Sequence, residues 1–370
     1  QAVHSGNPAG ILTGTALKRQ ENRIYHPINQ TEMSQKVLSI IVPTYNMEKY
    51  LAYCMDSFLI HKNLNKLEVL IVNDGSTDKS LEIARRYVSR AGDVFKIIDK
   101  KNGNYGSCIN AALPVATAKY VKVVDADDSV NTGNLDDFVS FLAEHDVDLA
   151  LSDFTLVNEE RIETKTISYN FGKSILPMEQ ICSTDRFKDM EMHAVTYRRE
   201  LLLSSGYFQT EGISYTDQQW IFSPMATVKT VGIFNRPVYQ YLIGRAGQTV
   251  DPAVKIKKMA DRIKCVLDMT IQYEKLHTQV SPAVKAYLDA RIRPNVQDIY
   301  LTYFTNTSKI DKALIREFDR KLKANAPFLY QYIHSLNLHI RLWRRIARFP
   351  LLEKIFCKGF TIALWLKLSF

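Results

Sequence analysis

Apolar and polar positions alternate in short blocks over residues 37–154, and these blocks predict strands separated by helices. Five apolar runs have the length and β-branched content of buried strands, at residues 37–42, 67–72, 94–98, 120–124 and 148–154. Helical periodicity lies between them, over residues 47–60 with Asn46 as the N-cap, around Leu81, Ala84 and Val88, and over residues 108–116 and 135–144. Helical connections between consecutive strands indicate an α/β protein with a mainly parallel sheet and flanking helices.

The alternation ends after residue 155, and the second half of the chain has a different character. Residues 155–250 are mixed and rich in aromatic side chains. From Asp251 on the pattern predicts helices, over residues 253–276, 283–305 (interrupted at Pro294) and 311–323.

Four parts follow from these changes. They are an N-terminal extension (1–36), an α/β domain (37–250), a helical C-terminal region (251–336) and a tail (337–370). The extension lacks periodicity and the apolar core of a secretory signal. No clean run of 18 apolar residues occurs in the sequence, which argues against a membrane-spanning helix.

Charge and cysteine usage narrow the function classes. The net charge is +9, of which the last 34 residues carry +6, so the body is nearly balanced and a nucleic-acid binder is disfavoured. The five cysteines are odd in number and widely spaced. They indicate neither a disulfide framework nor a zinc site, and a reducing compartment is the simplest interpretation.

The basic charge of the tail is patterned. Four arginines between residues 341 and 348 share one helix face, Pro350 ends that helix, and residues 351–370 are apolar with three interspersed lysines. Such a segment is typical of a helix at a bilayer interface, with its cations toward anionic headgroups. The alternative is a helical hairpin that packs on the body or on a second copy of the chain.

Polar residues follow three of the predicted strands, at residues 43–46, 73–78 and 125–128. The carboxyl ends of parallel strands meet at one edge of a sheet, where ligands bind. Asp125 and Asp127, at alternate positions, can face one Mg²⁺ or Mn²⁺ ion, which prefers carboxylate oxygens. An acidic turn that caps the next helix is the alternative.

These segments, together with residues 102–110, resemble in order and spacing the motifs of glycosyltransferase family 2 with the GT-A fold. The resemblance covers about residues 37–250. It implies a Rossmann-like, mainly parallel sheet followed by a helical region, in a bacterial-type enzyme of cell-envelope polysaccharide synthesis. It also implies a nucleotide-sugar donor, usually a UDP-sugar, and Mn²⁺ or Mg²⁺.

The resemblance assigns donor-binding roles to residues of the three strand ends. Residues near the nucleotide are Pro43, Thr44, Tyr45, Asn46 and Asp74, and residues near the ribose or sugar are Asp125 and Ala126. Asp127 matches the metal-binding position of the Asp-x-Asp motif, and Asp125 shares the metal. Plain turns and strand termination by proline are the structural alternatives for these segments.

The catalytic base is expected in a later acidic motif of this family. Asp217 matches it, although Thr216 replaces the usual glutamate. A carboxylate there would take the proton of the attacking acceptor hydroxyl in an inverting transfer. A helix N-cap is the alternative role for Asp217.

Three further residues are candidates from their place in the resemblance. His193 is a candidate for contact with metal or phosphate, although a single histidine is more often structural. Arg245 and Gln248, beside two glycines, are candidates to clamp the diphosphate, and a solvated surface loop is the alternative.

The sequence thus predicts an inverting, metal-dependent transferase that moves a sugar to a glycan hydroxyl, on a lipid-linked acceptor, at the inner face of the plasma membrane. Residues 337–370 would hold it peripherally on anionic lipid, and a homo-oligomer is compatible with the pattern. The alternative is a degenerate, non-catalytic binding or membrane-assembly module. A nucleotidyltransferase is disfavoured because residues 43–46 lack a Gly- and Lys/Arg-rich first loop.

Overall fold

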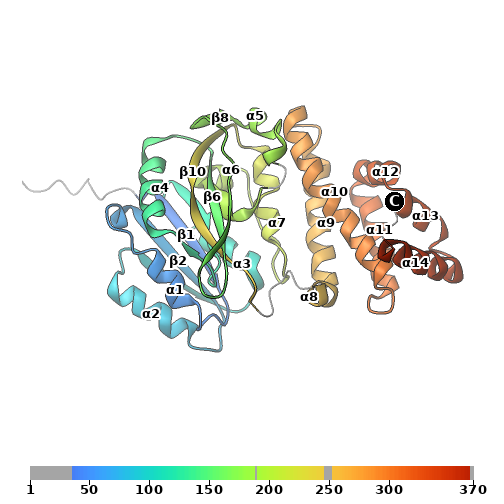
Figure 1. Cartoon of the computed structure of the whole chain (residues 1–370), viewed down its shortest axis with the longest axis horizontal. Helices are drawn as coiled ribbons and strands as arrows, with labels where there is room; N and C mark the ends of the chain where they lie inside the picture. Colours follow the sequence, from blue (N-terminus) through green and yellow to red (C-terminus); the bar gives the residue numbers. More distant parts are fainter. Residues whose placement is uncertain (1–35, 188–189, 246–251, 367–370) are drawn as a thin grey trace, which may run out of the picture. The chain divides into compact units, whose positions relative to one another are not determined.

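A ten-stranded sheet and its flanking helices form the first part of the computed structural model, which describes residues 36–187, 190–245 and 252–366 (Figure 1). The strands are β1 (Leu38–Thr44), β2 (Leu67–Asp74), β3 (Phe95–Lys100), β4 (Tyr120–Val123), β5 (Ser129–Val130), β6 (Leu149–Val157), β7 (Glu163–Ile167), β8 (Ile175–Pro177), β9 (Val195–Arg198) and β10 (Thr230–Leu242). Their order is β3-β2-β1-β4-β9-β6-β10-β5, with β7 beside β6 and β8 beside β10.

The first four strands of this order are parallel, as predicted. β9 then lies antiparallel between β4 and β6, while β6 and β10 pair in parallel. Helices cover the sheet, so β1 and β2 are buried almost throughout and read as continuous apolar runs. The predicted α/β class with a mainly parallel sheet is confirmed.

The helices beside the sheet are α1 (Leu51–Ser57), α2 (Ser80–Arg90), α3 (Asn104–Ala112), α4 (Thr132–Glu144), α5 (Met178–Cys182), α6 (Arg199–Ser204) and α7 (Asp217–Trp220). Two predicted helix starts are wrong. Asn46 is not an N-cap, because it adopts φ 54 and its side chain accepts a hydrogen bond from the Thr77 amide at 2.8 Å. α3 begins at Asn104 instead of residue 108.

The helical C-terminal region, also as predicted, comprises α8 (Pro252–Lys257), α9 (Met259–Leu276), α10 (Pro282–Thr305), α11 (Lys312–Asn325), α12 (Pro327–Leu336), α13 (Leu338–Ile346) and α14 (Pro350–Trp365). Pro294 lies inside α10 without ending it. Ile292 and Val296 on either side are fully buried, and such packing can outweigh the backbone bond that proline removes.

The tail packs on this region through one face. Glu353 of α14 is buried and accepts hydrogen bonds from Tyr303 Oη and Trp343 Nε1, both at 2.9 Å, and it pairs with Lys312. Arg344 of α13 lies 3.6 Å above the Tyr330 ring. The hairpin alternative therefore describes the inner face of the tail.

The outer face of α14 is apolar and exposed. Leu351, Ile355, Ile362 and Leu366 recur at helical spacing, with exposed fractions between 47% and 69%. Over the part of the chain that the structure describes, no helix has the length and hydropathy needed to span a bilayer. All five cysteines are buried and free. Boundaries at residues 250 and 336 stay predictions, since the described residues from Lys36 on cluster as one unit.

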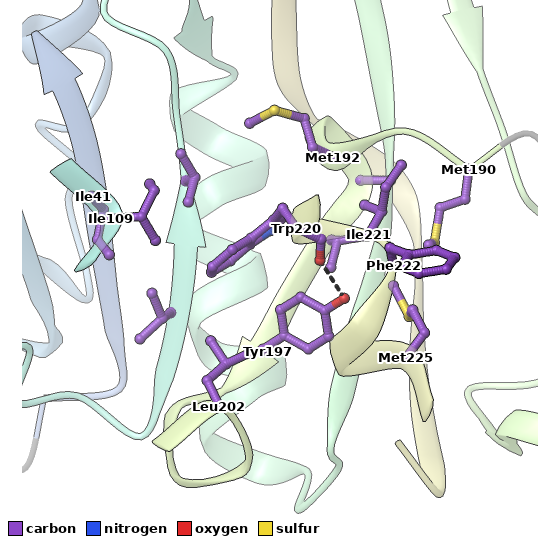
Figure 2. Packing of buried hydrophobic residues seen from close by; sticks show 14 of the residues in the cluster. Ile41, Ile109, Met190, Met192, Tyr197, Leu202, Trp220, Ile221, Phe222 and Met225 are labelled. Atoms are coloured by element: carbon purple, nitrogen blue, oxygen red, sulfur yellow. Dashed lines mark hydrogen bonds between the residues drawn. The ribbon is translucent and has the colours of Figure 1, made fainter. Parts of the chain in front are cut away.

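A dense apolar cluster anchors α7, the short helix that begins at Asp217. Trp220 is fully buried, and its carbonyl accepts a hydrogen bond from Tyr197 Oη of β9 at 2.8 Å (Figure 2). Met192 and Phe222 belong to the same cluster (Figure 2). Because α7 has only four residues, this packing, and not helix propensity, holds it in place.

Candidate functional site

A cavity of about 650 Å³ opens at the carboxyl ends of β1, β2 and β4. Ten residues predicted from the sequence line it: Pro43, Thr44, Tyr45, Asp74, Asp125, Ala126, Asp127, His193, Asp217 and Arg245. Asn46 is turned toward Thr77 and is not among the lining residues, and Gln248 lies outside the described residues. The topology thus brings the strand-end motifs together as expected.

Three carboxylates form the acidic centre of this cavity. Each of Asp125, Asp127 and Asp128 offers an oxygen within 4.8 Å of the others. They lie on a tight turn between β4 and β5, closed by a hydrogen bond from the Asp128 amide to the Asp125 carbonyl at 3.0 Å. Burial, and next the Asp127 charge, raise the pKa of Asp125 to about 7. A divalent cation would relieve this crowding, so the donor set fits Mg²⁺ or Mn²⁺.

Two tyrosine hydroxyls donate hydrogen bonds to different carboxylates of this group. Asp128 is fixed to the scaffold, because Tyr239 Oη donates to one of its oxygens at 2.5 Å and the Leu242 amide donates to the other at 2.7 Å. Asp125 accepts a hydrogen bond from Tyr105 Oη at 2.7 Å and lines the cavity together with Asp127. Asp125 and Asp127 are therefore the residues that would hold a cation, and Asp128 supports the turn.

Arg245, at the end of β10, pairs with the acidic centre. Its Nε and a terminal nitrogen lie 2.9 Å and 2.8 Å from Asp127 Oδ2, and its guanidinium faces the Tyr50 ring at 5.5 Å. A cation bound to this oxygen would release the guanidinium toward other anionic groups. The position fits the predicted role of a diphosphate clamp, which stays a prediction.

Asp74, for which the sequence predicts contact with the nucleotide, is held in place by two donors. Its Oδ1 accepts hydrogen bonds from Lys100 Nζ at 2.6 Å and from the Gly103 amide at 2.9 Å. Gly75 follows with φ +70, and a Cβ there would meet the Asn102 amide at 3.0 Å, so the turn requires glycine. Tyr45 is 48% exposed and lines the same cavity, and its contact with a base stays a prediction.

Asp217 lines the cavity from α7, outside the strand-end motifs. It is the first residue of α7, and the N-cap position belongs to Thr216, whose side chain makes no capping bond. Tyr215 before it adopts φ 67, which turns the chain sharply into the helix. Burial raises the pKa of Asp217, which makes its carboxylate a stronger base than a solvated one.

His193 lies in a short 3₁₀ turn (Met192–Ala194) and its ring stacks on Tyr241 with centroids 4.3 Å apart. Burial, and next the Lys122 charge, lower the pKa of His193 to about 3, so the imidazole is neutral. It lines the cavity but does not belong to the carboxylate group above. Its metal-binding role stays a prediction.

Sequence reasoning missed three residues of the site. Tyr105 binds Asp125, and its signal was an aromatic residue inside the motif at residues 102–106. Tyr239 binds Asp128 from β10, and its signal was its place at the start of the segment that contains Arg245. Lys122 donates to the His193 carbonyl at 2.6 Å, and its signal was a lysine in the middle of a buried strand.

Comparison with known proteins places this geometry among glycosyltransferases. Residues 39–202 match the family model of glycosyl transferase family 2. The poly(ribitol-phosphate) beta-N-acetylglucosaminyltransferase TarS of Staphylococcus aureus is 28% identical over 218 residues, which are 58% of this chain and 37% of TarS. The uncharacterized glycosyltransferase YibD of Escherichia coli is 29% identical over 219 residues, 57% of this chain and 62% of YibD. The matches thus span less than two thirds of these relatives.

The crystal structure of S. aureus TarS 1–349 in complex with UDP-GlcNAc has the same fold. It superposes with a TM-score of 0.63 at 18% identity, over 90% of this chain and 92% of that chain. The same TarS fragment in complex with UDP gives a TM-score of 0.64. The coverage includes helices of the C-terminal region, so the expected GT-A fold with a helical extension is confirmed.

Proposed function

We propose, on the premise that residues 39–202 match the family model of glycosyl transferase family 2, that the chain transfers a sugar from a UDP-sugar to a hydroxyl group of a glycan. The transfer proceeds with inversion and with a divalent cation. One observation carries the proposal. A single cavity is lined by Asp74, by the pair Asp125 and Asp127, and by Asp217, which come from separate segments of the chain. These are the groups that donor binding, diphosphate binding and proton removal require.

The donor would lie across the strand ends. Tyr45 would stack on the base and Asp74 would accept hydrogen bonds from the base or ribose. Asp125 and Asp127 would hold Mn²⁺ or Mg²⁺, which supplies charge neutralisation for the leaving diphosphate when bound. UDP-GlcNAc in the TarS complex supports a UDP-sugar as the donor class.

Asp217 would then act on the acceptor. Its carboxylate takes the proton of the acceptor hydroxyl as that oxygen attacks the anomeric carbon from the face opposite the diphosphate. The raised pKa of Asp217 favours this transfer. Arg245 would leave Asp127 and contact the diphosphate, where a guanidinium makes charge-assisted bonds.

A UDP-release assay tests this mechanism. We expect turnover with a UDP-sugar in the presence of Mn²⁺, loss of turnover with EDTA, and loss in Asp127→Asn and Asp217→Asn. Asp137→Asn, at an exposed aspartate of α4, is the matched control and should keep full activity. A protein that binds UDP-sugars without releasing UDP, with or without Mn²⁺, would instead be a non-catalytic binding module.

We further propose that the acceptor is a lipid-linked glycan of the cell envelope and that α14 rests on the cytoplasmic face of the membrane. The support is the exposed stripe of Leu351, Ile355 and Ile362, with Lys354 and Lys358 on the same helix. Each cation near an anionic surface contributes about 1 kcal/mol. The acceptor named for TarS, poly(ribitol-phosphate), supports a polymeric envelope acceptor.

Liposome flotation tests the membrane proposal. Wild type should float with vesicles that contain anionic lipid, and the triple variant Leu351→Ser, Ile355→Ser, Ile362→Ser should not. Val115→Ser, at an exposed apolar residue outside the tail, controls for surface hydrophobicity. Equal flotation of the triple variant and wild type would contradict the proposal.

A further inference from the structure

The hairpin between β6 and β7 places an arginine against the acidic turn from outside the sequence motifs. Arg161, next to the end of this hairpin turn, donates a hydrogen bond from a terminal nitrogen to the Asp127 carbonyl at 3.0 Å. Its guanidinium lies 4.3 Å from the centre of the Tyr53 ring of α1. One side chain thus joins the hairpin, α1 and the turn that carries the proposed metal ligands.

The backbone at Arg161 is unusual for a residue of this kind. It adopts φ 62, a left-handed conformation that glycine and asparagine enter more readily than arginine. The turn is closed by a 2.9 Å bond from the Arg161 amide to the Asn158 carbonyl and a 2.9 Å bond from the Ile162 amide to Asn158 Oδ1. Strained positions of this type persist where the surrounding structure fixes them, and they cluster near functional sites.

The contact differs from that of Arg245 in one respect. Arg245 binds the carboxylate of Asp127, the group that a cation would take, whereas Arg161 binds the main-chain carbonyl. A cation at Asp127 would therefore displace the first arginine and leave the second in place. The other terminal nitrogen of Arg161 is buried without a hydrogen-bond partner among the described residues, so the guanidinium is not oriented by a further acid.

We propose that Arg161 is a positioning residue that fixes the Asp127 main chain for divalent-cation binding. It acts through the main chain of the turn and does not occupy a carboxylate oxygen of Asp127. The inference rests on the proposed function, because it needs a cation at Asp125 and Asp127. It adds a residue that lies 34 positions after Asp127 in the chain and belongs to none of the recognised motifs.

Mn²⁺ binding in the presence of UDP, measured by electron paramagnetic resonance, tests the proposal without relying on turnover. Arg161→Gln should weaken Mn²⁺ binding by about tenfold or more, the usual effect of removing a group that orients a metal ligand. Arg161→Lys keeps the charge but not the planar fork, and it should give an intermediate loss. Arg236→Gln, at an exposed arginine of β10 that pairs with Asp137, is the matched control and should bind Mn²⁺ as wild type does.

Tyr53→Leu supplies a second route, since it removes the ring under the guanidinium and leaves Arg161 in place. It should weaken Mn²⁺ binding in the same direction by a smaller factor, also if Arg161→Gln does not fold. Folded Arg161 variants, checked by thermal melting without ligands, that bind Mn²⁺ as tightly as wild type would overturn the proposal. Wild type that binds UDP but no Mn²⁺ would overturn the metal site itself, and this inference with it.

Discussion

Two acidic centres of this chain differ in how well neighbouring donors and cations balance their negative charge. In the helical region, Glu353 is 2% exposed and is surrounded by two donors and the cation of Lys312. In the cavity, Asp125, Asp127 and Asp128 are crowded together, and the described cation on their side chains is Arg245. One acid has two hydrogen-bond donors and the cation of Lys312, whereas three neighbouring acids share the cation of Arg245 among the described residues.

This difference indicates a structural role for Glu353 and a ligand-binding role for the cavity acids. A buried carboxylate with donors and a cation joins helices and needs nothing further. Carboxylates that burial and mutual repulsion keep from ionising are held together against their own electrostatics by the surrounding fold. Such a centre lowers the stability of the ligand-free protein and gains its compensation from a ligand, as active sites commonly do.

The largest expected effect concerns Asp217, the cavity-lining acid at the start of α7. Asp217→Asn should reduce sugar transfer by a factor of about 10²–10⁴, because it removes the general base. The thermal shift caused by UDP should remain, since Asp217 is not on the nucleotide side. Transfer at the wild-type rate would show that another group takes the proton.

Removing the acid of the helical region should affect stability instead of chemistry. Glu353→Ala leaves the buried Tyr303 hydroxyl and Trp343 Nε1 without an acceptor, and each loss costs about 1–3 kcal/mol. Urea unfolding should show the decrease, while turnover per folded molecule at low temperature should stay unchanged. A loss of turnover with normal stability would contradict the structural role assigned to Glu353.

Removing an acid of the cavity should raise stability, whereas removing Glu353 should lower it. Folding raises the pKa of Asp125 to about 7, against a value of about 3.9 in an unfolded chain. Between about pH 4 and pH 7 the carboxyl is protonated in the folded state but ionised in the unfolded state, so the metal-free fold loses stability across this window. The full loss is present at pH 8, where Asp125→Asn should raise the melting temperature by a few degrees. The gain should shrink as the pH falls and vanish below about pH 4, where the carboxyl is protonated in both states. A gain of equal size at pH 4 and pH 8 would contradict this account.

The smallest effect is expected at an exposed ion pair. Asp137 and Arg236 lie 2.7 Å apart with nearly half of each side chain exposed. Asp137→Asn should change the free energy of unfolding by less than about 0.5 kcal/mol, because water screens such pairs. A larger change would mean that charge alone, and not burial, explains the stability effects expected at Glu353 and Asp125.

Much of the site could be predicted because strand ends converge. Asp74, Asp125 and Asp127 follow apolar runs, and parallel pairing of β1, β2 and β4 brings them to one edge. The predicted start of the first helix was wrong because the Asn46 side chain binds the Thr77 amide instead of capping the helix.

Contacts made through the main chain or across the sheet left no local pattern. Tyr239 reaches Asp128 from 111 residues away, and Arg161 reaches a carbonyl that any residue would provide. The tail showed a similar limit. Its single acid, Glu353, was visible in the sequence, but only the fold shows that Tyr303 and Trp343 bind it. Only the fold shows, too, that Glu353, Cys357 and Phe360 form the buried face of α14.

The segment that carries Asp217 is held by contacts from the sheet and from the C-terminal helices. This arrangement limits where two such enzymes can be joined into a chimera. Tyr197 of the sheet binds the Trp220 carbonyl, while Tyr287 of α10 binds the Ile221 carbonyl at 2.5 Å. Cys265 of α9 lies 3.2 Å from the Tyr215 carbonyl. A chimera joined near residue 250 would replace two of these three supports, Tyr287 and Cys265. The transferable module is therefore the sheet together with α9 and α10, and helices beyond them are the parts open to exchange.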